Sequence, residues 1–157
     1  MTFLSPMTEA EFTAYTEVSI PEFAQEKVQS GQWAQDESLA LARKAYADLL
    51  PQGLATPDNF FYTVRNSATQ AAIGMLWFAV QVRAGQRTAF VYDVSIYAAH
   101  QRQGHAKRAF AALEVEVRAH GLSGIGLHVF GHNTGAQALY ASLGYAVTNV
   151  NMFKPLG

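Results

Sequence analysis

The stretch from Gln101 to Ala106 has the features of an anion-binding loop. It contains a single glycine, Gly104, follows a β-branched and aromatic run from Phe90 to Tyr97, and leads into a helical pattern. In a strand, loop and helix of this kind, backbone N–H groups of the first helical turn converge on one spot. The helix dipole adds about half a positive charge there. Because glycine has no side chain, Gly104 would let a phosphate approach the backbone closely, although an ordinary loop glycine is the alternative.

Asp93 is the second candidate, since it is the one ionisable residue inside the apolar strand that precedes this loop. Alternation places it on the face opposite Val94 and Ile96, unless a bulge intervenes. Burial raises the pKa of a carboxyl group and suits it to act as a general base. A base is useful for an alkylamine, of which only about one part in 2,500 is neutral at pH 7. The alternative is a structural Asp paired with an arginine or with backbone.

The composition limits the classes of function. The chain has 157 residues, is half apolar, carries a net charge of −1 and contains no cysteine. The length predicts one domain, and the absence of clustered Lys and Arg argues against nucleic-acid and membrane-surface partners. Without cysteine there is no disulfide, thiolate zinc site or cysteine nucleophile. The histidines form no metal-like cluster, so we expect no metal. The N-terminus lacks a signal-peptide pattern and no apolar run reaches the ~20 residues of a membrane span, so we expect a cytoplasmic protein.

The N-terminal third is predicted to be helical after a short strand at residues 2–5. Thr8 to Glu11 fits a capping box, which predicts a helix that begins at Thr8 and that Pro21 breaks or kinks. Asp36 is the expected cap of a second helix, which ends at Pro51.

The remaining two thirds alternate between strand and helix patterns. Three strands at residues 60–64, 73–82 and 88–97 have short connections, which predicts an antiparallel meander. A helix over 104–120 and a strand over 124–130 then imply a parallel pair. Asn133 caps a short helix, Gly144 ends it, and a last strand is expected over 145–153. The fold class is therefore α+β: a mixed sheet of six to seven strands, largely antiparallel with one parallel pair, and about four helices.

This order of elements resembles the GNAT superfamily of N-acetyltransferases. The resemblance is carried by Gln101-x-x-Gly104-x-Ala106 between strand and helix, and by Asn133, Tyr140 and Gly144-Tyr145 after the next strand. It covers roughly residues 60–153. It implies an acetyl-CoA-dependent N-acetyltransferase of one domain, with residues 1–57 as an acceptor-side cap and residues 58–157 as the coenzyme-binding core.

The resemblance also implies roles for individual residues. The pyrophosphate of acetyl-CoA would bind the backbone N–H groups of the loop, and the pantetheine arm would pair with a strand edge like an extra strand. Tyr140 would face the thioester sulfur as a general acid, although its spacing from Ala136 and Leu143 also fits a core tyrosine. Lacking cysteine, the protein would transfer the acetyl group directly within a ternary complex. The residues expected to contact the cofactor are Val94, Ser95, Ile96, Gln101, Arg102, Gln103, Gly104, His105, Ala106, Lys107, Asn133 and Tyr140.

The sequence does not identify the acceptor, which could be a small-molecule amine or an amine of a peptide or protein. Tyr15, Glu22 and Phe23 in the N-terminal helix could offer carboxylates and aromatic faces to an amine. The main alternative function is a non-catalytic acyl-CoA-binding module of the same fold. A dinucleotide-binding domain fits less well, because Gly-x-Gly-x-x-Gly and repeated βαβ units are absent. The oligomeric state stays open, a homodimer included.

Overall fold

One five-stranded sheet organises the protein, a computed structural model of which describes all of residues 1–157. The strands lie in the order β1-β2-β3-β4-β5, and every neighbouring pair is antiparallel except β4 and β5, which are parallel. Their bounds are Thr2–Pro6 (β1), Asn59–Asn66 (β2), Ala72–Arg83 (β3), Gln86–Ile96 (β4) and Ile125–Leu127 (β5). The α+β class, the meander and the single parallel pair expected from the sequence are thus confirmed.

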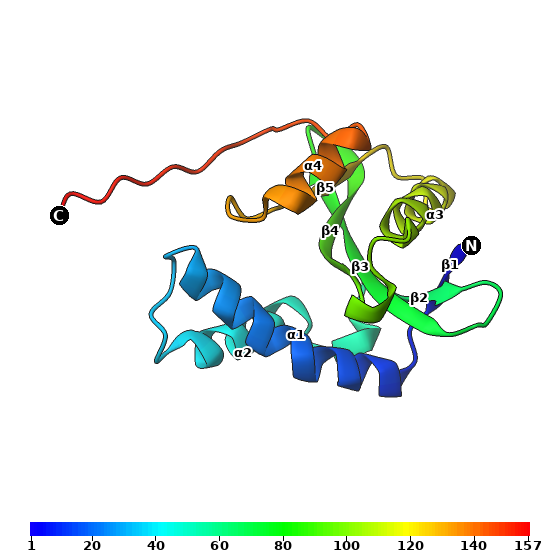
Figure 1. The fold of residues 1–157 in the computed structure, drawn as a ribbon, viewed down its shortest axis with the longest axis horizontal. Helices are drawn as coiled ribbons and strands as arrows, with labels where there is room; N and C mark the ends of the chain where they lie inside the picture. The colour runs from blue at the N-terminus through cyan, green and yellow to red at the C-terminus, as the bar shows by residue number, and fades with distance from the viewer.

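Four α-helices cover the two faces of this sheet (Figure 1). α1 and α2 pack on one face, and α3 and α4 on the other. Two single turns of 3-10 helix, η1 and η2, connect neighbouring elements. The bounds are Glu9–Gln29 (α1), Ser38–Leu49 (α2), Gly53–Ala55 (η1), Ala98–His100 (η2), His105–Ala119 (α3) and Thr134–Ser142 (α4). No helix combines the length and apolar character that crossing a bilayer would need.

The central strand β3 supplies both halves of the core, as its almost wholly apolar sequence predicted. Leu76 and Phe78 point toward α3 and pack with Phe110, while Met75 and Trp77 point toward α1 and α2. Residues from Ile73 to Ala79 are buried, which fits a strand covered on both faces.

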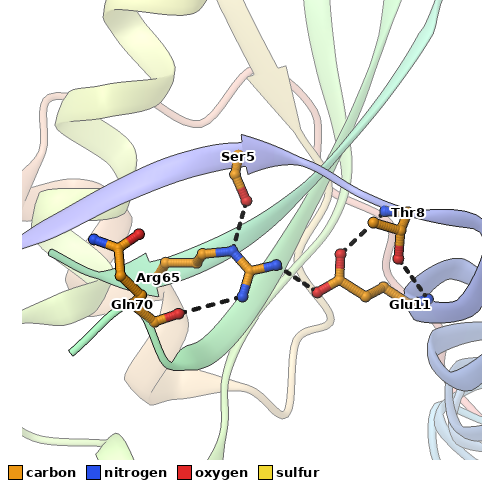
Figure 2. Close-up of polar contacts among 5 residues, drawn as sticks. All are labelled: Ser5, Thr8, Glu11, Arg65 and Gln70. Atoms are coloured by element: carbon orange, nitrogen blue, oxygen red, sulfur yellow. Dashed lines mark hydrogen bonds and ion pairs between the residues drawn. The ribbon is translucent and has the colours of Figure 1, made fainter.

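A polar network fixes the start of α1 to the sheet (Figure 2). Thr8 and Glu11 form the predicted capping box, in which the Glu11 amide donates to Thr8 Oγ1 at 3.1 Å and the Thr8 amide donates to Glu11 Oε1 at 3.0 Å. Arg65 of β2 donates from Nη2 to Glu11 Oε2 at 2.7 Å and from Nε to Ser5 Oγ at 2.8 Å. Burial alone would raise the pKa of Glu11, but the bonds from Thr8 and Arg65 hold it below its ordinary value.

The expected break at Pro21 is absent. α1 continues through this residue to Gln29 and ends at Ser30, close to the predicted stop. Pro21 cannot donate to the carbonyl of Glu17, but the side chains of both residues are exposed, so solvent can hydrate that carbonyl. The predicted cap of α2 is also wrong by one residue, since Glu37 rather than Asp36 precedes the helix.

The six or seven strands predicted are one or two too many. The strand expected over 124–130 is paired only from Ile125 to Leu127, and residues 145–157 form no strand at all. Instead the chain leaves Gly144 and leads away from the sheet (Figure 1). A strand pattern needs a neighbouring edge, and this segment meets none within its own chain.

Replacing Glu11 tests the anchoring of α1. Glu11→Ala should lower the free energy of unfolding by about 1–2 kcal/mol at pH 7, because it removes half of the capping box and the bond to Arg65. Glu114→Ala, which breaks the exposed pair with Arg118, is the matched control and should change stability little. Urea unfolding measures both.

The same variant has an expected pH dependence. Because the folded-state pKa of Glu11 is lowered, its contribution is complete above the ordinary carboxyl pKa of 4.5 and is lost as the pH falls through the folded value. The difference between wild type and Glu11→Ala should therefore shrink below pH 4.5. A difference that stays constant into acid would contradict the assignment.

Candidate active site

A β-bulge in β4 shapes the site. Trp77 of β3 pairs with Asp93 and the next residue, Phe78, pairs with Val91, so Tyr92 is an extra residue with no partner in β3. On the other side of β4, pairing with β5 ends at Val91. Beyond this point, the β4 edge that faces away from β3 has no strand partner. Bulges of this kind re-aim side chains and end pairing next to functional sites.

The bulge also reverses the alternation of β4. Ala89 and Val91 point into the core beside α3, so strict alternation would send Asp93 to the same side. The extra residue instead places Tyr92 and Asp93 both on the face covered by α1, and returns Val94 and Ile96 to the α3 side. Asp93 therefore lies opposite Val94 and Ile96, as alternation predicted, and the bulge decides that Asp93 faces α1.

The first turn of α3 presents free N–H groups. Gly104 is the N-cap, no side chain caps this helix, and the first helical hydrogen bond runs from the Arg108 amide to the Gly104 carbonyl. The amides from Gly104 to Lys107 therefore lack an intrahelical acceptor. α1 and α4, by contrast, are capped by Thr8 and Asn133. An uncapped helix start fits an anion that supplies the missing acceptors.

Gly104 is required by the backbone of this loop. Its φ is +81°, in the left-handed region that favours glycine. A Cβ at this position would also lie 3.0 Å from Arg108 Nη1. Arg108 closes the loop from behind, donating from Nη2 to the Gln103 carbonyl at 2.6 Å and from Nε to Thr2 Oγ1 at 3.2 Å. The loop shape is thus held by a guanidinium that reaches β1.

A pocket of about 240 Å³ opens beside these amides. It is bounded by Ile96 at the end of β4, by the loop, and by Leu139 of α4. It therefore joins the free edge of β4 to the start of α3. The lining residues are Ile96, His100, Gln101, Arg102, Gly104, His105, Ala106, Lys107 and Leu139.

The side chains of the predicted loop residues have different surroundings. Gln101 donates from Nε2 to the Ile96 carbonyl at 2.9 Å and so ties the loop to β4. The His105 ring is buried against Thr2, with Nδ1 at 2.9 Å from Thr2 Oγ1; burial and then the Arg108 charge lower its pKa. Only the backbone of His105 is therefore placed to meet a ligand. Arg102 and Lys107 are exposed.

Asp93 is held by α1. The hydroxyl of Tyr15 donates to Asp93 Oδ2 at 2.7 Å. Burial raises the pKa of Asp93, while the bond from Tyr15 and one from the Val94 amide act in the opposite direction. The net result is a carboxyl group whose pKa lies above its ordinary value, which is suited to accept a proton near neutral pH.

A second carboxylate, that of Glu26, lies within electrostatic reach of Asp93. Burial raises the pKa of Glu26 of α1, the charges of Asp93 and Glu22 raise it further, and His132 opposes them. His132 belongs to the loop between β5 and α4. One end of α1 and this loop thus surround Asp93 with acidic and imidazole groups.

Tyr140 of α4 faces the same group of charges. Its ring packs edge-on against Phe110 at 5.5 Å and Tyr145 at 5.9 Å, while its hydroxyl donates to no protein group. Burial raises the pKa of Tyr140, and the charges of Asp93 and Glu26 raise it further. The phenol is therefore protonated at pH 7 and free to donate.

The other predicted positions lie around these groups. Asn133 is the N-cap of α4, as expected, and accepts from the Ala136 amide at 3.2 Å. Val94 and Ile96 are half-buried on the free edge of β4, and Ser95 between them is exposed. No group of three His, Asp or Glu side chains converges in a way that could hold a metal ion.

Comparison with known proteins agrees with this geometry. The family model for the acetyltransferase (GNAT) family matches residues 20–145. The chain belongs to the GNAT acetyltransferases. Two Bacillus subtilis (strain 168) proteins described as uncharacterized N-acetyltransferases are similar over 153 residues, YycN at 35% and YdgE at 34% identity. In each case the match covers 98% of this chain and 97% of the relative.

Solved structures confirm the GNAT fold. The crystal structure of B. subtilis YycN superposes with a TM-score of 0.94 over 99% of both chains. An aminoglycoside acetyltransferase from an uncultured soil metagenomic sample superposes with a TM-score of 0.60 at 14% identity. The superposition covers 99% of this chain and 97% of the other, and it shows the shared fold alone.

Sequence reasoning did not connect α1 with Asp93. Tyr15 was an acceptor-side candidate only, and Glu26 was not singled out. The signal was present, because Tyr15, Ser19, Glu22 and Glu26 follow the i, i+4, i+7, i+11 spacing of one helix face. The role of Arg108 in bracing the loop from behind was not anticipated either.

Replacing Asp93 by Asn tests whether its carboxylate costs stability. The pKa of Asp93 is higher in the folded state than in the unfolded state. The ionised carboxylate therefore lowers the free energy of unfolding in full above the folded-state pKa, and this cost disappears below the ordinary pKa of 3.8. Asp93→Asn should therefore unfold at a higher temperature than wild type at pH 8 and at an equal temperature near pH 3.5, as measured by calorimetry. A variant less stable than wild type at pH 8 would show that the carboxylate is a structural partner of Tyr15.

Proposed function

We propose that the protein is an acetyl-CoA-dependent N-acetyltransferase that moves the acetyl group directly to an amine. The observation that carries the proposal is the combination of unpaired amides at the start of α3 with Asp93 and Tyr140 beyond the free edge of β4. In this division, residues 58–157 bind the coenzyme and residues 1–57 complete the acceptor side.

The residues present fit acetyl-CoA. The four amides from Gly104 to Lys107 would donate hydrogen bonds to the pyrophosphate. The dipole of α3 adds a favourable positive charge at the same place. Gly104 adopts its left-handed φ without strain, which keeps the loop backbone beside the pocket. Val94 and Ile96 would offer backbone groups to the pantetheine amides, as an added strand does at an open sheet edge.

The reaction forms a bond between the amine nitrogen and the acetyl carbon and breaks the bond from that carbon to sulfur. Asp93 would take the proton that the ammonium must lose, directly or through water. Tyr140 would donate a hydrogen bond or its proton to the departing sulfur. A backbone N–H near Val94 would polarise the thioester carbonyl. With no cysteine in the chain, we propose a ternary complex without an acyl-enzyme.

The acidic surroundings favour a cationic acceptor. The charges of Asp93 and Glu22 raise the pKa of Glu26, and an ammonium group placed beside these carboxylates would relieve that repulsion. The acceptor would approach between α1 and the loop that carries His132. We therefore propose an alkylamine acceptor, which is protonated at neutral pH before it reacts.

Tyr140→Phe tests the catalytic role and distinguishes an enzyme from an acyl-CoA-binding module. The variant should lose about 10²-fold or more of kcat and keep its affinity for acetyl-CoA, since only the phenolic proton is removed. The measurements are thiol release with a panel of alkylamines and calorimetric titration. Tyr145→Phe is the matched control: it removes a phenol from the same aromatic cluster and should keep full activity.

Gly104→Ala tests the phosphate site. The variant should bind acetyl-CoA at least tenfold more weakly, because a side chain is strained at this φ and would press on Arg108, which braces the loop, so that the amides shift. Gly85→Ala is the control, since Gly85 has a similar φ of +77° but lies in the hairpin between β3 and β4 with open space around it. Equal affinities in both variants would contradict the assignment of the loop.

A further inference from the structure

The C-terminal segment from Ala146 to Gly157 exposes apolar side chains that its own chain does not cover. Val147, Met152 and Phe153 are 82–91% exposed, and Val150 and Leu156 are exposed as well. The segment contains a single charge, that of Lys154. Disordered tails that stay in water are rich in charge and poor in apolar residues, and this one has the opposite composition. An apolar segment of this length is expected to be covered by protein.

The sheet offers an edge of matching character. β5 is the last strand, it pairs with β4 on one side, and its other edge has no strand. Beside this edge lies a groove of about 450 Å³, which is separate from the candidate active site. Leu122, Ile125 and Leu127 line it together with Arg118 of α3 and the first residues after α4. Unpaired edges of this kind readily accept a strand.

The residues after α4 have the pattern of one strand. From Tyr145 to Phe153 the sequence is rich in β-branched and aromatic residues, and Thr148, Val150 and Met152 share one side of an extended chain. Tyr145 is anchored by its ring against Phe110 and Tyr140, and Gly144, with a φ of +94°, directs the chain outward from there. In Figure 1 the segment runs away from the sheet and its β5 edge.

The superposition with the YycN crystal structure bears on the C-terminal segment. It covers 99% of both chains with a TM-score of 0.94, so the alignment includes most of residues 145–157. This agreement between two proteins that are 35% identical favours an outward segment in both.

From these observations we infer that two copies of this chain exchange their C-terminal segments, residues 146–153 of each pairing with the free β5 edge of the other. The exchange is reciprocal, so a two-fold axis closes the assembly at two copies. It covers the apolar side chains of the segment and fills the groove beside β5. It does not depend on the proposed reaction.

Light scattering of the full chain is the first test. The expected mass is twice the 17.1 kDa of one chain. Val150→Pro removes a backbone N–H from the added strand, and its side chain is exposed in the single chain, so the variant should be a folded monomer. Val18→Asp changes an exposed apolar residue on α1 and should remain dimeric. A monomeric wild type, or a dimer that survives Val150→Pro, would overturn the inference.

Engineered disulfides separate exchange from folding back within one chain. The chain has no native cysteine, so pairs can be introduced cleanly. Gly126→Cys on β5, where a Cβ meets no atom closer than 3.6 Å, is combined with cysteine at each position from 148 to 152 in turn. Exchange predicts that oxidation links two chains at one or more of these positions. A disulfide within single chains, or none at any position, would overturn the inference.

Discussion

The extra residue at Tyr92 is the constraint on which the candidate site depends. A regular β4 would keep Asp93 on the side of Ala89 and Val91, inside the core that packs on α3. One inserted residue reverses this alternation, so that the carboxylate meets Tyr15 of α1 while Val94 and Ile96 stay on the α3 side. Pairing with β5 ends one residue before the bulge. The same local irregularity therefore supplies both a half-buried carboxylate and an open strand edge.

The elements around the bulge are held by polar contacts at their ends and by apolar contacts along their lengths. α1 is tied to β2 through Glu11 and Arg65, and Trp77 stacks on Tyr92 at 4.7 Å between ring centres. The start of α3, unlike that of α1, carries no side-chain cap, and Arg108 supports the preceding loop from behind. Free amides at that position cost stability unless an anion supplies acceptors. This uncapped start, which opens into the pocket beside Ile96 and Leu139, marks the loop as a binding element.

Much of the fold was predictable because local physics dominates it. The capping box at Thr8, the apolar run of β3, Gly104 at the start of α3 and Asn133 as an N-cap each act within a few residues. The errors arose where distant partners decide. Pro21 is tolerated inside α1 because its surroundings are exposed, and the pattern after Tyr145 is strand-like without a strand partner in its own chain. Neither the bulge nor the approach of Glu26 to Asp93 is visible in local sequence, since both depend on how separate elements pack.

The most direct test of the account is an amide NMR titration of the full chain with acetyl-CoA. We expect the largest chemical-shift changes at the amides from Gly104 to Lys107, because the pyrophosphate would accept hydrogen bonds from them. A second group of changes is expected at Val94 and Ile96, because the pantetheine would pair with the backbone there. Saturable changes confined to another part of the sheet, or no change at millimolar acetyl-CoA, would contradict it.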